Sequence, residues 1–277
     1  MGLAELKDRT VLVTGAGSGI GRATALAFAR CGARLVVSDI NATALTGVRT
    51  EIEALGTPCH VHVADVADEA AMRAMAEAVH AAVGPLDVLV NNAGIGYLGS
   101  FVSSPLESWR RVIDINVMGV VHGCYFFLPR MVAAGGLRRI VNVASLAGIA
   151  PAATMSAYAA SKHAVIGLSD VLALELASTE VGVTTVCPGI IDTPITDSPA
   201  AISPSVPAEQ LARLRAYYRA NGAQPERVAD AIVDGVTRGR SLVLVGPMAR
   251  PAYHIKRISR GLLRRLSLAD SRKAGYL

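Results

Sequence analysis

Four side chains near the middle of the chain are of types that can together move a proton: Asn116, Ser145, Tyr158 and Lys162. Tyr158 and Lys162 are four residues apart in the segment Tyr-Ala-Ala-Ser-Lys, and on a helix this spacing puts both side chains on one face. A lysine ammonium beside a phenol stabilises the phenolate, so it lowers the tyrosine's pKa from its ordinary value of about 10. The set therefore predicts a tyrosine acid/base that acts on a hydroxyl or carbonyl group.

Each of these residues also has an ordinary structural explanation when it is considered alone. A serine often ends a strand, as Ser145 does after the apolar run 140–144, and a tyrosine commonly packs in a core. A lysine is usually a solvated helix residue, and Asn116, inside a helical pattern, needs only a hydrogen-bond partner if it is buried. It is the joint spacing of the four residues that favours a catalytic site.

A glycine-rich turn, Thr14-Gly-Ala-Gly-Ser-Gly-Ile-Gly21, follows a short β-branched run and opens a helical pattern. Glycines let the backbone approach a pyrophosphate, and the helix N-terminus supplies N–H donors. Asp39 ends the next strand-like run, where its carboxylate would accept hydrogen bonds from a ribose diol and repel a 2′-phosphate. Since the turn carries no basic residue, the sequence predicts a dinucleotide site that prefers NAD to NADP. Asp39 could instead cap the following helix, but Asn41 is better placed for that role.

Two further motifs at predicted strand ends leave alternatives open. Asp65 and Val66 could line an adenine pocket, or Asp65 could merely cap the next helix. The small residues of Asn91-Asn92-Ala93-Gly94 could form a wall beneath a cofactor, or an ordinary asparagine-rich turn.

Strand-like and helix-like runs alternate along the 277 residues, which predicts a parallel sheet covered by helices on both faces. Hydrophobic residues make up 52% of the chain and charged residues 18%, as expected for one α/β domain with a large core. We expect strands over 10–13, 34–38, 59–63, 86–90, 139–143, 183–186 and 242–245. We expect helices over 19–31, 41–55, 68–83, 105–131 (bent near Gly119 or Gly123), 155–177 and 225–236.

Together the motifs resemble the short-chain dehydrogenase/reductase family over about residues 6 to 246, in family order and spacing; Pro188-Gly189 and Thr193 complete the set. The resemblance implies a single-domain Rossmann fold with a seven-stranded parallel sheet, assembled as a homodimer or homotetramer. We therefore predict a catalytic domain over 1–246, with a proline-rich substrate-binding region at 190–224, and a basic C-terminal extension over 247–277.

The same resemblance implies a role for each matching residue. Tyr158 would be the general acid/base, Lys162 would lower its pKa and bind the nicotinamide ribose, and Ser145 would bind the substrate oxygen. Asn116 would hold a water in a proton relay. The implied cofactor-binding residues are Gly15, Ser18, Gly19, Ile20, Gly21, Asp39, Asp65, Val66, Asn92, Ala93, Gly94, Tyr158, Lys162, Pro188, Gly189, Ile191 and Thr193.

The predicted activity is NAD-dependent interconversion of a secondary alcohol and its ketone. Ile95, Tyr97, Ile149 and Ile190 suggest a lipophilic pocket for a steroid, terpenoid, long-chain or aromatic substrate. An NADP-dependent ketoreductase, such as a 3-oxoacyl reductase, is the alternative that Asp39 opposes. Sugar epimerases and dehydratases usually have longer chains and a different glycine spacing. A non-enzymatic NAD sensor or scaffold is opposed by the intact catalytic set.

The net charge of +5 comes from residues 248–277, which alone carry +7. Ile255, Ile258, Leu262 and Leu266 fall on one helical stripe among basic residues. Such a helix could lie on an anionic membrane or pack against its own body or a sister subunit. Nucleic-acid binding is not expected, because aromatic residues are sparse there.

The four cysteines form no CxxC pair and lie in apolar contexts, which predicts buried, reduced thiols. The six histidines form no ligand cluster, so no metal site is predicted. Neither a signal peptide nor an apolar run long enough to span a bilayer is evident, and we expect a cytoplasmic protein.

Overall fold

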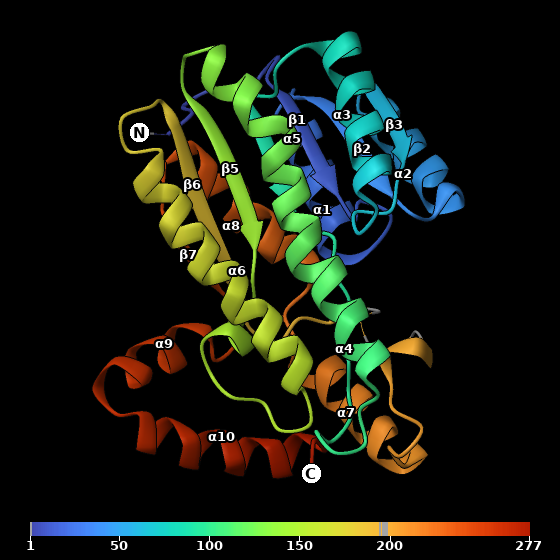
Figure 1. The fold of residues 1–277 in the computed structure, drawn as a ribbon, viewed down its shortest axis with the longest axis vertical. Helices are drawn as coiled ribbons and strands as arrows, with labels where there is room; N and C mark the ends of the chain where they lie inside the picture. Colours follow the sequence, from blue (N-terminus) through green and yellow to red (C-terminus); the bar gives the residue numbers. More distant parts are fainter. Residues whose placement is uncertain (1, 194, 196–198) are drawn as a thin grey trace.

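The computed structural model describes residues 2–193, 195 and 199–277 of the chain, and a parallel sheet of seven strands lies at its centre (Figure 1). The strands are β1 (Thr10–Thr14), β2 (Arg34–Asp39), β3 (Cys59–Val63), β4 (Val88–Asn91), β5 (Arg138–Val143), β6 (Val181–Pro188) and β7 (Leu242–Val245). They pair in the order β3-β2-β1-β4-β5-β6-β7, so the predicted fold class is confirmed.

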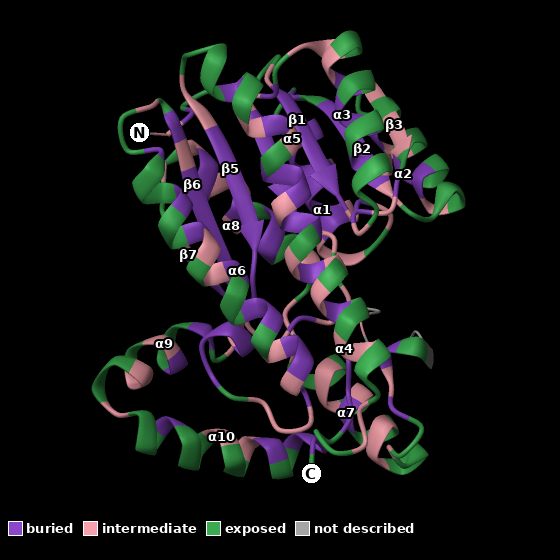
Figure 2. Ribbon diagram, in the orientation of Figure 1, coloured by how far each residue is buried: buried purple, intermediate pink, exposed green. Residues whose placement is uncertain are grey.

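Helices cover both faces of the sheet because successive side chains of each strand point to opposite sides. Val11 and Val13 of β1 belong to the apolar core shared with α1 (Gly19–Arg30), α2 (Ala42–Ala54) and α8 (Pro225–Thr237). Leu12 belongs to the core on the other face, shared with α3 (Glu69–Val83), α5 (Gly119–Ala133) and α6 (Ser156–Glu175). The strands β1, β4, β5 and β6 are accordingly buried along their centres, whereas the edge strand β3 has only half-buried and exposed residues (Figure 2).

The long predicted helix over 105–131 is interrupted where glycine was expected to bend it. It consists of α4 (Leu106–Ile113), a π-helical turn η1 (Asp114–Met118) and α5, which begins at Gly119. By length and composition, the helix Leu106–Ala133 could cross a membrane, with a mean hydropathy of 1.4 in its most apolar window. Since 44% of that window is buried and α5 packs on α3 and the sheet, the helix has the character of a core helix.

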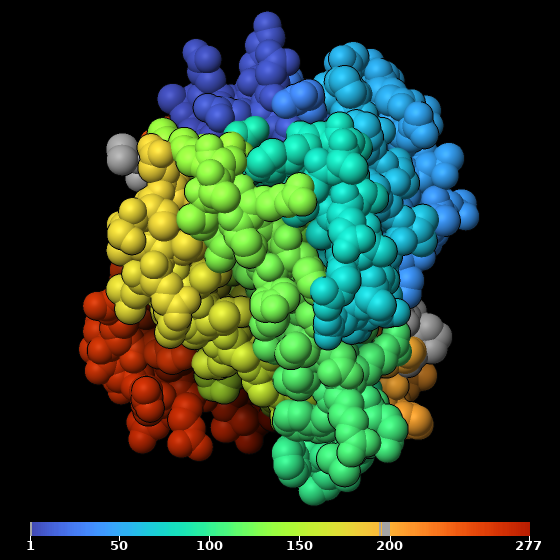
Figure 3. Space-filling model, turned by 45° about the horizontal axis from the view of Figure 1, so that its top comes forward, coloured from blue at the N-terminus to red at the C-terminus, as the bar shows by residue number. Residues whose placement is uncertain are grey.

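The structure departs from the sequence predictions after β6. The predicted substrate-binding region contains a helix, α7 (Ala208–Asn221), and the basic segment forms two helices, α9 (Ala249–Ile258) and α10 (Arg260–Ala274). All three gather beyond the carboxyl ends of the strands (Figure 1). The C-terminal helices lie against the body of the domain (Figure 3). The prediction of buried thiols is wrong for Cys31, which is exposed, and right for Cys124 and Cys187.

Replacing Gly123 in α5 by alanine should destabilise the protein by about 1–3 kcal/mol, because the core cannot accept a methyl group there. The added Cβ would overlap Oδ1 of the buried Asn91, whose Nδ2 donates to Asn142 Oδ1 over 2.9 Å. Gly47→Ala in α2 is the matched control: nothing lies within 4 Å of its added Cβ, so the change should stabilise by about 0.5–1 kcal/mol. Urea denaturation measures both, and equal effects of the same sign would contradict this account.

Candidate active site

The site begins where the strand order reverses, between β1 and β4. The Thr14 hydroxyl accepts hydrogen bonds from the backbone N–H of Asn92 and of Ala93, each at 3.1 Å. In return, the Asn92 side-chain amide donates to the carbonyls of Thr14 (2.9 Å) and Gly15 (3.2 Å). These contacts join the two strand ends and open the crevice in which parallel α/β sheets bind nucleotides. Of the two interpretations of the asparagine-rich motif, the wall of a binding cleft is the one that the structure supports.

The glycines of the glycine-rich turn pack closely against neighbouring atoms, where a side chain would not fit. Gly15 has a φ of +64°, and a Cβ there would come within 2.7 Å of Ala93 Cα. A Cβ on Gly17 would come within 2.9 Å of the Asp39 carboxylate. The turn then leads into α1, whose first three residues line the cleft and whose first N–H groups have no partner within the helix. This cradle fits the pyrophosphate of a dinucleotide.

The Asp39 carboxylate is held at the end of β2 by two backbone donors. Gly17 N donates to Oδ2 and Asn41 N donates to Oδ1, both over 2.9 Å. Asn41 caps α2 through Ala44 N (3.0 Å), so the capping role considered for Asp39 belongs to Asn41, as expected. Asp39 lines the cleft and is available to a ribose diol.

The sequence left two roles open for Asp65, lining an adenine pocket or capping the next helix, and in the structure the cap is Asp68. Asp68 Oδ1 accepts hydrogen bonds from Ala70 N and Ala71 N and so caps α3. Asp65 Oδ1 accepts from Ala67 N over 2.9 Å, which shapes the turn after β3, and Asp65 lines the cleft together with Val66.

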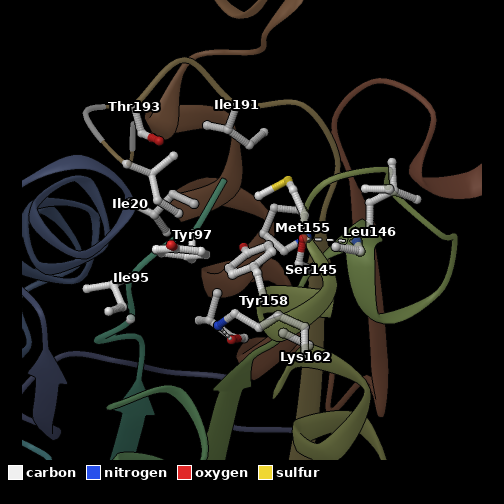
Figure 4. Close-up of a pocket in the computed structure, with 18 of the residues that line it drawn as sticks. Ile20, Ile95, Tyr97, Ser145, Leu146, Met155, Tyr158, Lys162, Ile191 and Thr193 are labelled. Atoms are coloured by element: carbon white, nitrogen blue, oxygen red, sulfur yellow. Dashed lines mark hydrogen bonds between the residues drawn. The ribbon is translucent and has the colours of Figure 1, made fainter. Parts of the chain in front are cut away.

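Ser145, Tyr158 and Lys162 face one cavity, from the end of β5 and from α6 (Figure 4). Ser145 Oγ accepts a hydrogen bond from Ala147 N (3.1 Å) at the start of a short 3₁₀ turn, and its hydroxyl is near enough to the Tyr158 phenol to lower the pKa of that group. Lys162 is only 4% exposed, and its Nζ donates to the carbonyl of Val143 over 2.9 Å. The predicted sharing of one helix face by Tyr158 and Lys162 is confirmed, with Nζ 5.8 Å from the centre of the phenol ring.

The pKa of Tyr158 moves opposite to the prediction. Burial, the largest cause, raises the pKa of Tyr158 to about 12, although the hydrogen bond from Ser145 lowers it. Burial likewise lowers the pKa of Lys162 to about 8. Both shifts favour the uncharged form, because a buried charge loses its hydration. Lys162 is not among the causes of the shift at Tyr158, so the predicted lowering of this pKa by the lysine is not observed in the protein alone.

Asn116 lies apart from the cavity wall and uses its whole side-chain amide within the protein. Oδ1 accepts from Ile95 N (2.8 Å), and Nδ2 donates to Ile95 O (2.9 Å) and to Ser161 Oγ (3.0 Å). The amide thus attaches the π-helical turn to the segment after β4 and to α6, which explains why a polar residue is buried there. Its role in a water relay stays a prediction.

The glycine-rich cradle and the residues around Tyr158 line one cavity of about 540 Å³. Every residue predicted to contact the cofactor lines it, as do Ser145, Ile95, Tyr97 and Ile190. Ile149 does not; it is buried in the core between the sheet and α6. In the view of Figure 4, Ile20 and Ile95 lie across the cavity from Ser145.

Much of the remaining cavity wall comes from residues that the sequence did not place in the site. They are Met155, Leu214 and Tyr218, Met248 just before α9, Ala252 and Ile255 from α9, Leu263, Leu266, Ser267, Asp270 and Ser271 from α10, and Tyr276 after Gly275. The predicted stripe is divided: Ile255 and Leu266 line the cavity, whereas Ile258 and Leu262 are exposed. Of the alternatives for the basic segment, packing on its own body is observed. Its apolar periodicity was the available signal, but periodicity does not identify the surface that a helix covers.

The geometry defines a dinucleotide-binding α/β protein with a tyrosine, a lysine and a serine at one end of the cleft. Comparison with known proteins agrees. The model of the short chain dehydrogenase family matches residues 9–201. The chain is 43% identical over 255 residues to the probable oxidoreductase EphD of Mycobacterium tuberculosis, covering 91% of this chain but 43% of that protein's length. It is 42% identical over 192 residues to the cyclohexanol dehydrogenase of Acinetobacter sp., covering 69% of this chain and 76% of that protein.

Solved structures with bound nucleotides share the fold. A short-chain dehydrogenase/reductase from Burkholderia phymatum in complex with NAD superposes with a TM-score of 0.86 at 31% identity, covering 94% of this chain and 96% of that one. A metagenomic short-chain oxidoreductase in complex with NADP gives a TM-score of 0.72 at 32% identity, covering 87% and 98%. The chain belongs to the short-chain dehydrogenase family.

The burial of Lys162 predicts a specific pH dependence of stability. Its pKa is about 8 in the fold, against an ordinary 10.5. Below pH 8 the buried Lys162 of the folded state is charged. Between about pH 8 and 10, the folded protein releases this proton while the unfolded chain keeps it, so the free-energy cost of burying the charged lysine declines as the pH rises. The unfolding free energy of the wild type minus that of Lys162→Met should therefore rise by about 2 kcal/mol across this window.

Urea denaturation of both proteins from about pH 7 to 10 measures this difference. Taking the difference cancels Cys124 and Tyr158, whose raised pKa values make both proteins less stable at high pH. Both proteins also carry Cys187→Ala, because Lys162 lowers the pKa of Cys187 and this thiol would not cancel. A flat difference would show that Lys162 keeps its ordinary pKa in the fold, and a falling one would show that its pKa is raised; either result contradicts this prediction.

Proposed function

We propose that this protein is an NAD-dependent dehydrogenase that interconverts a hydrophobic secondary alcohol and its ketone. The observation that carries the proposal is that Ser145, Tyr158 and Lys162 face the same cavity as the cradle bordered by Asp39. Bound there, the nicotinamide would accept or donate the hydride. The protein's part is to position the alcohol and to move its proton.

Each residue near the reacting end has a distinct task in this proposal. The hydroxyls of Ser145 and Tyr158 bind the substrate oxygen, and Tyr158 takes or returns the proton. Lys162, held by the Val143 carbonyl, supplies a positive charge near the phenol and donors toward the nicotinamide ribose. Asn116 keeps the neighbouring helix in place. The cavity excludes water through its apolar wall.

The preference for NAD is supported by the geometry around Asp39. Both carboxylate oxygens are oriented by backbone donors, and a 2′-phosphate would meet this charge. A side chain at Gly17, where a basic residue could offset the carboxylate, has no room beside Asp39 and Ala44. NADP-dependent 3-oxoacyl reduction is therefore disfavoured, and the intact catalytic set disfavours a purely sensing role.

The hydrophobic character of the substrate is supported by Ile95, Tyr97, Ile190, Met155 and Leu263, which line the cavity. A relative at 42% identity is a cyclohexanol dehydrogenase, which makes a cyclic secondary alcohol a reasonable first probe. Steroid, terpenoid, long-chain and aromatic alcohols complete the panel.

Tyr158→Phe should reduce NAD-dependent turnover by a factor of about 10² to 10⁴, because it removes the acid/base while keeping the ring. Binding of NADH, followed by its fluorescence, should change little. NADH absorbance during oxidation of the alcohol panel measures turnover. Tyr97→Phe is the control, since Tyr97 lines the cavity and is 4% exposed, and it should stay within about tenfold of the wild type. Full activity of Tyr158→Phe would remove this residue from the reaction.

Asp39→Ala should lower the ratio of kcat/KM with NAD to that with NADP by roughly tenfold or more, because charge-assisted hydrogen bonds to the ribose are lost along with the repulsion. Asp68→Ala is the matched control: Asp68 lies in the neighbouring strand–helix turn, and it does not line the cavity. Its ratio should equal the wild-type value. If both variants keep that value, Asp39 does not select the cofactor.

We also propose that the chain acts in the cytoplasm as a homodimer or homotetramer. Tyr125, Val171 and Leu174 are exposed along α5 and α6 and would be covered in such an assembly. Contact with an anionic membrane is a separate proposal, supported by the exposed Ile258 and Leu262 beside the arginines of α9 and α10.

A further inference from the structure

Two phenols meet at the end of the cavity formed by α7 and α10. The hydroxyls of Tyr218 and Tyr276 are 2.6 Å apart, and both side chains line the same cavity as Tyr158. A pair of hydroxyls 2.6 Å apart uses one O–H between them, so the second O–H and the remaining lone pairs stay available to a third oxygen. This is an unusual polar feature in a wall that is otherwise mostly apolar.

The position of Tyr276 is fixed by its backbone. The Tyr276 carbonyl accepts hydrogen bonds from Thr154 Oγ1 (3.1 Å) and Gln210 Nε2 (3.0 Å), and its N–H donates to Ser271 O (2.9 Å). Gly275, with a φ of +87°, ends α10 and turns the chain toward α7 (Figure 1). Because the backbone is anchored at three points, the phenol is held in place before any ligand arrives, which reduces the ordering cost of binding.

The phenol pair is close to the reacting hydroxyl. A charge on Tyr218 would raise the pKa of Tyr158, and a charge on Tyr158 would raise that of Tyr276. Burial is the largest cause of the raised pKa values of both Tyr218 and Tyr276. The pair therefore stays protonated near neutrality and can donate a hydrogen bond.

The charges around the pair favour an uncharged partner. Asp270 of α10 lines the cavity here, and its charge contributes to the raised pKa values of Tyr218 and Tyr276. Among the described residues of the wall, the only lysine or arginine side chains are Lys162 and Arg111. Lys162 is bonded to Val143, and Arg111 belongs to α4 rather than to α7 or α10. A carboxylate or phosphate beside Asp270 would be repelled, whereas a hydroxyl or ketone oxygen would be accepted.

We propose that Tyr218 and Tyr276 form a second polar subsite, which hydrogen-bonds an uncharged hydroxyl or ketone oxygen of a substrate whose alcohol carbon reacts at Tyr158. The preferred substrate is then a hydrophobic molecule with two oxygen functions, such as a diol or a hydroxyketone. This inference rests on the proposed function for the identity of the reacting end.

Binding to the NADH complex tests the subsite without requiring turnover. The probes are cyclohexanone and its 2-, 3- and 4-hydroxy derivatives, titrated calorimetrically into the wild type and three variants. In the wild type, at least one hydroxyketone should bind roughly five- to tenfold more tightly than cyclohexanone, as expected for one net hydrogen bond. Tyr218→Phe and Tyr276→Phe should each abolish this advantage while leaving the Kd of cyclohexanone nearly unchanged.

Tyr217→Phe is the matched control. The Tyr217 hydroxyl also joins α7 to α10, through Asp270 Oδ1 at 3.0 Å, but Tyr217 is absent from the cavity wall. This variant should keep the hydroxyketone advantage. If the tyrosine pair only fastens α10, Tyr218→Phe and Tyr276→Phe will weaken all four ketones alike, and this result would overturn the subsite. A wild type that shows no advantage for any isomer would overturn it equally.

The two proposals fail in different ways. If the hydroxyketones bind with an advantage that depends on Tyr218 and Tyr276 but are not reduced, the subsite stands and the proposed reaction is wrong. If cyclohexanone is reduced with NADH in a Tyr158-dependent manner but no isomer shows the advantage, the reaction stands and the subsite is wrong.

Discussion

The joint between the ends of β1 and β4 is the contact on which the rest of the site depends. Thr14 and Asn92 exchange hydrogen bonds across it. After β1 the chain continues from this joint into the glycine-rich turn, and after β4 it continues into the segment that Asn116 binds. A weaker joint would let the strand ends separate and would release Gly15 from its position against Ala93. The pyrophosphate cradle and the reacting end are thus held by the same few bonds.

The cofactor half of the site could be predicted from the sequence because its signals are local. A strand, a glycine turn and an aspartate at the next strand end lie within thirty residues, and parallel pairing brings them together automatically. Tyr158 and Lys162 likewise share one helix. The substrate half could not be predicted, since Tyr218 and Tyr276 are 58 residues apart and meet only through the packing of α7 and α10. The pKa of Tyr158 was misjudged for a related reason: the neighbouring charge is visible in a sequence motif, whereas burial is a property of the whole fold.

Burial sets the resting state of the catalytic pair. It disfavours charge on the phenol and on the ammonium alike, so the proton stays on Tyr158 while the pKa of Lys162 falls to about 8. The Val143 carbonyl gives Lys162 a hydrogen-bond partner without a counter-charge, which leaves its positive charge free to act on other groups in the cavity. A carboxylate at that position would neutralise it.

Part of the cavity wall lies outside the span of the chain that the family model matches. The dinucleotide cradle, Ser145, Tyr158 and Lys162 all lie within residues 9–201, the span that the family model matches. The surfaces contributed by α7, α9 and α10 lie beyond it. Changes after residue 201 can therefore alter this part of the wall while Ser145, Tyr158 and Lys162 keep their places in the cavity. In evolutionary terms, the last quarter of the chain can diversify while the rest is kept, and grafting it between relatives would exchange one part of the cavity wall on a common scaffold.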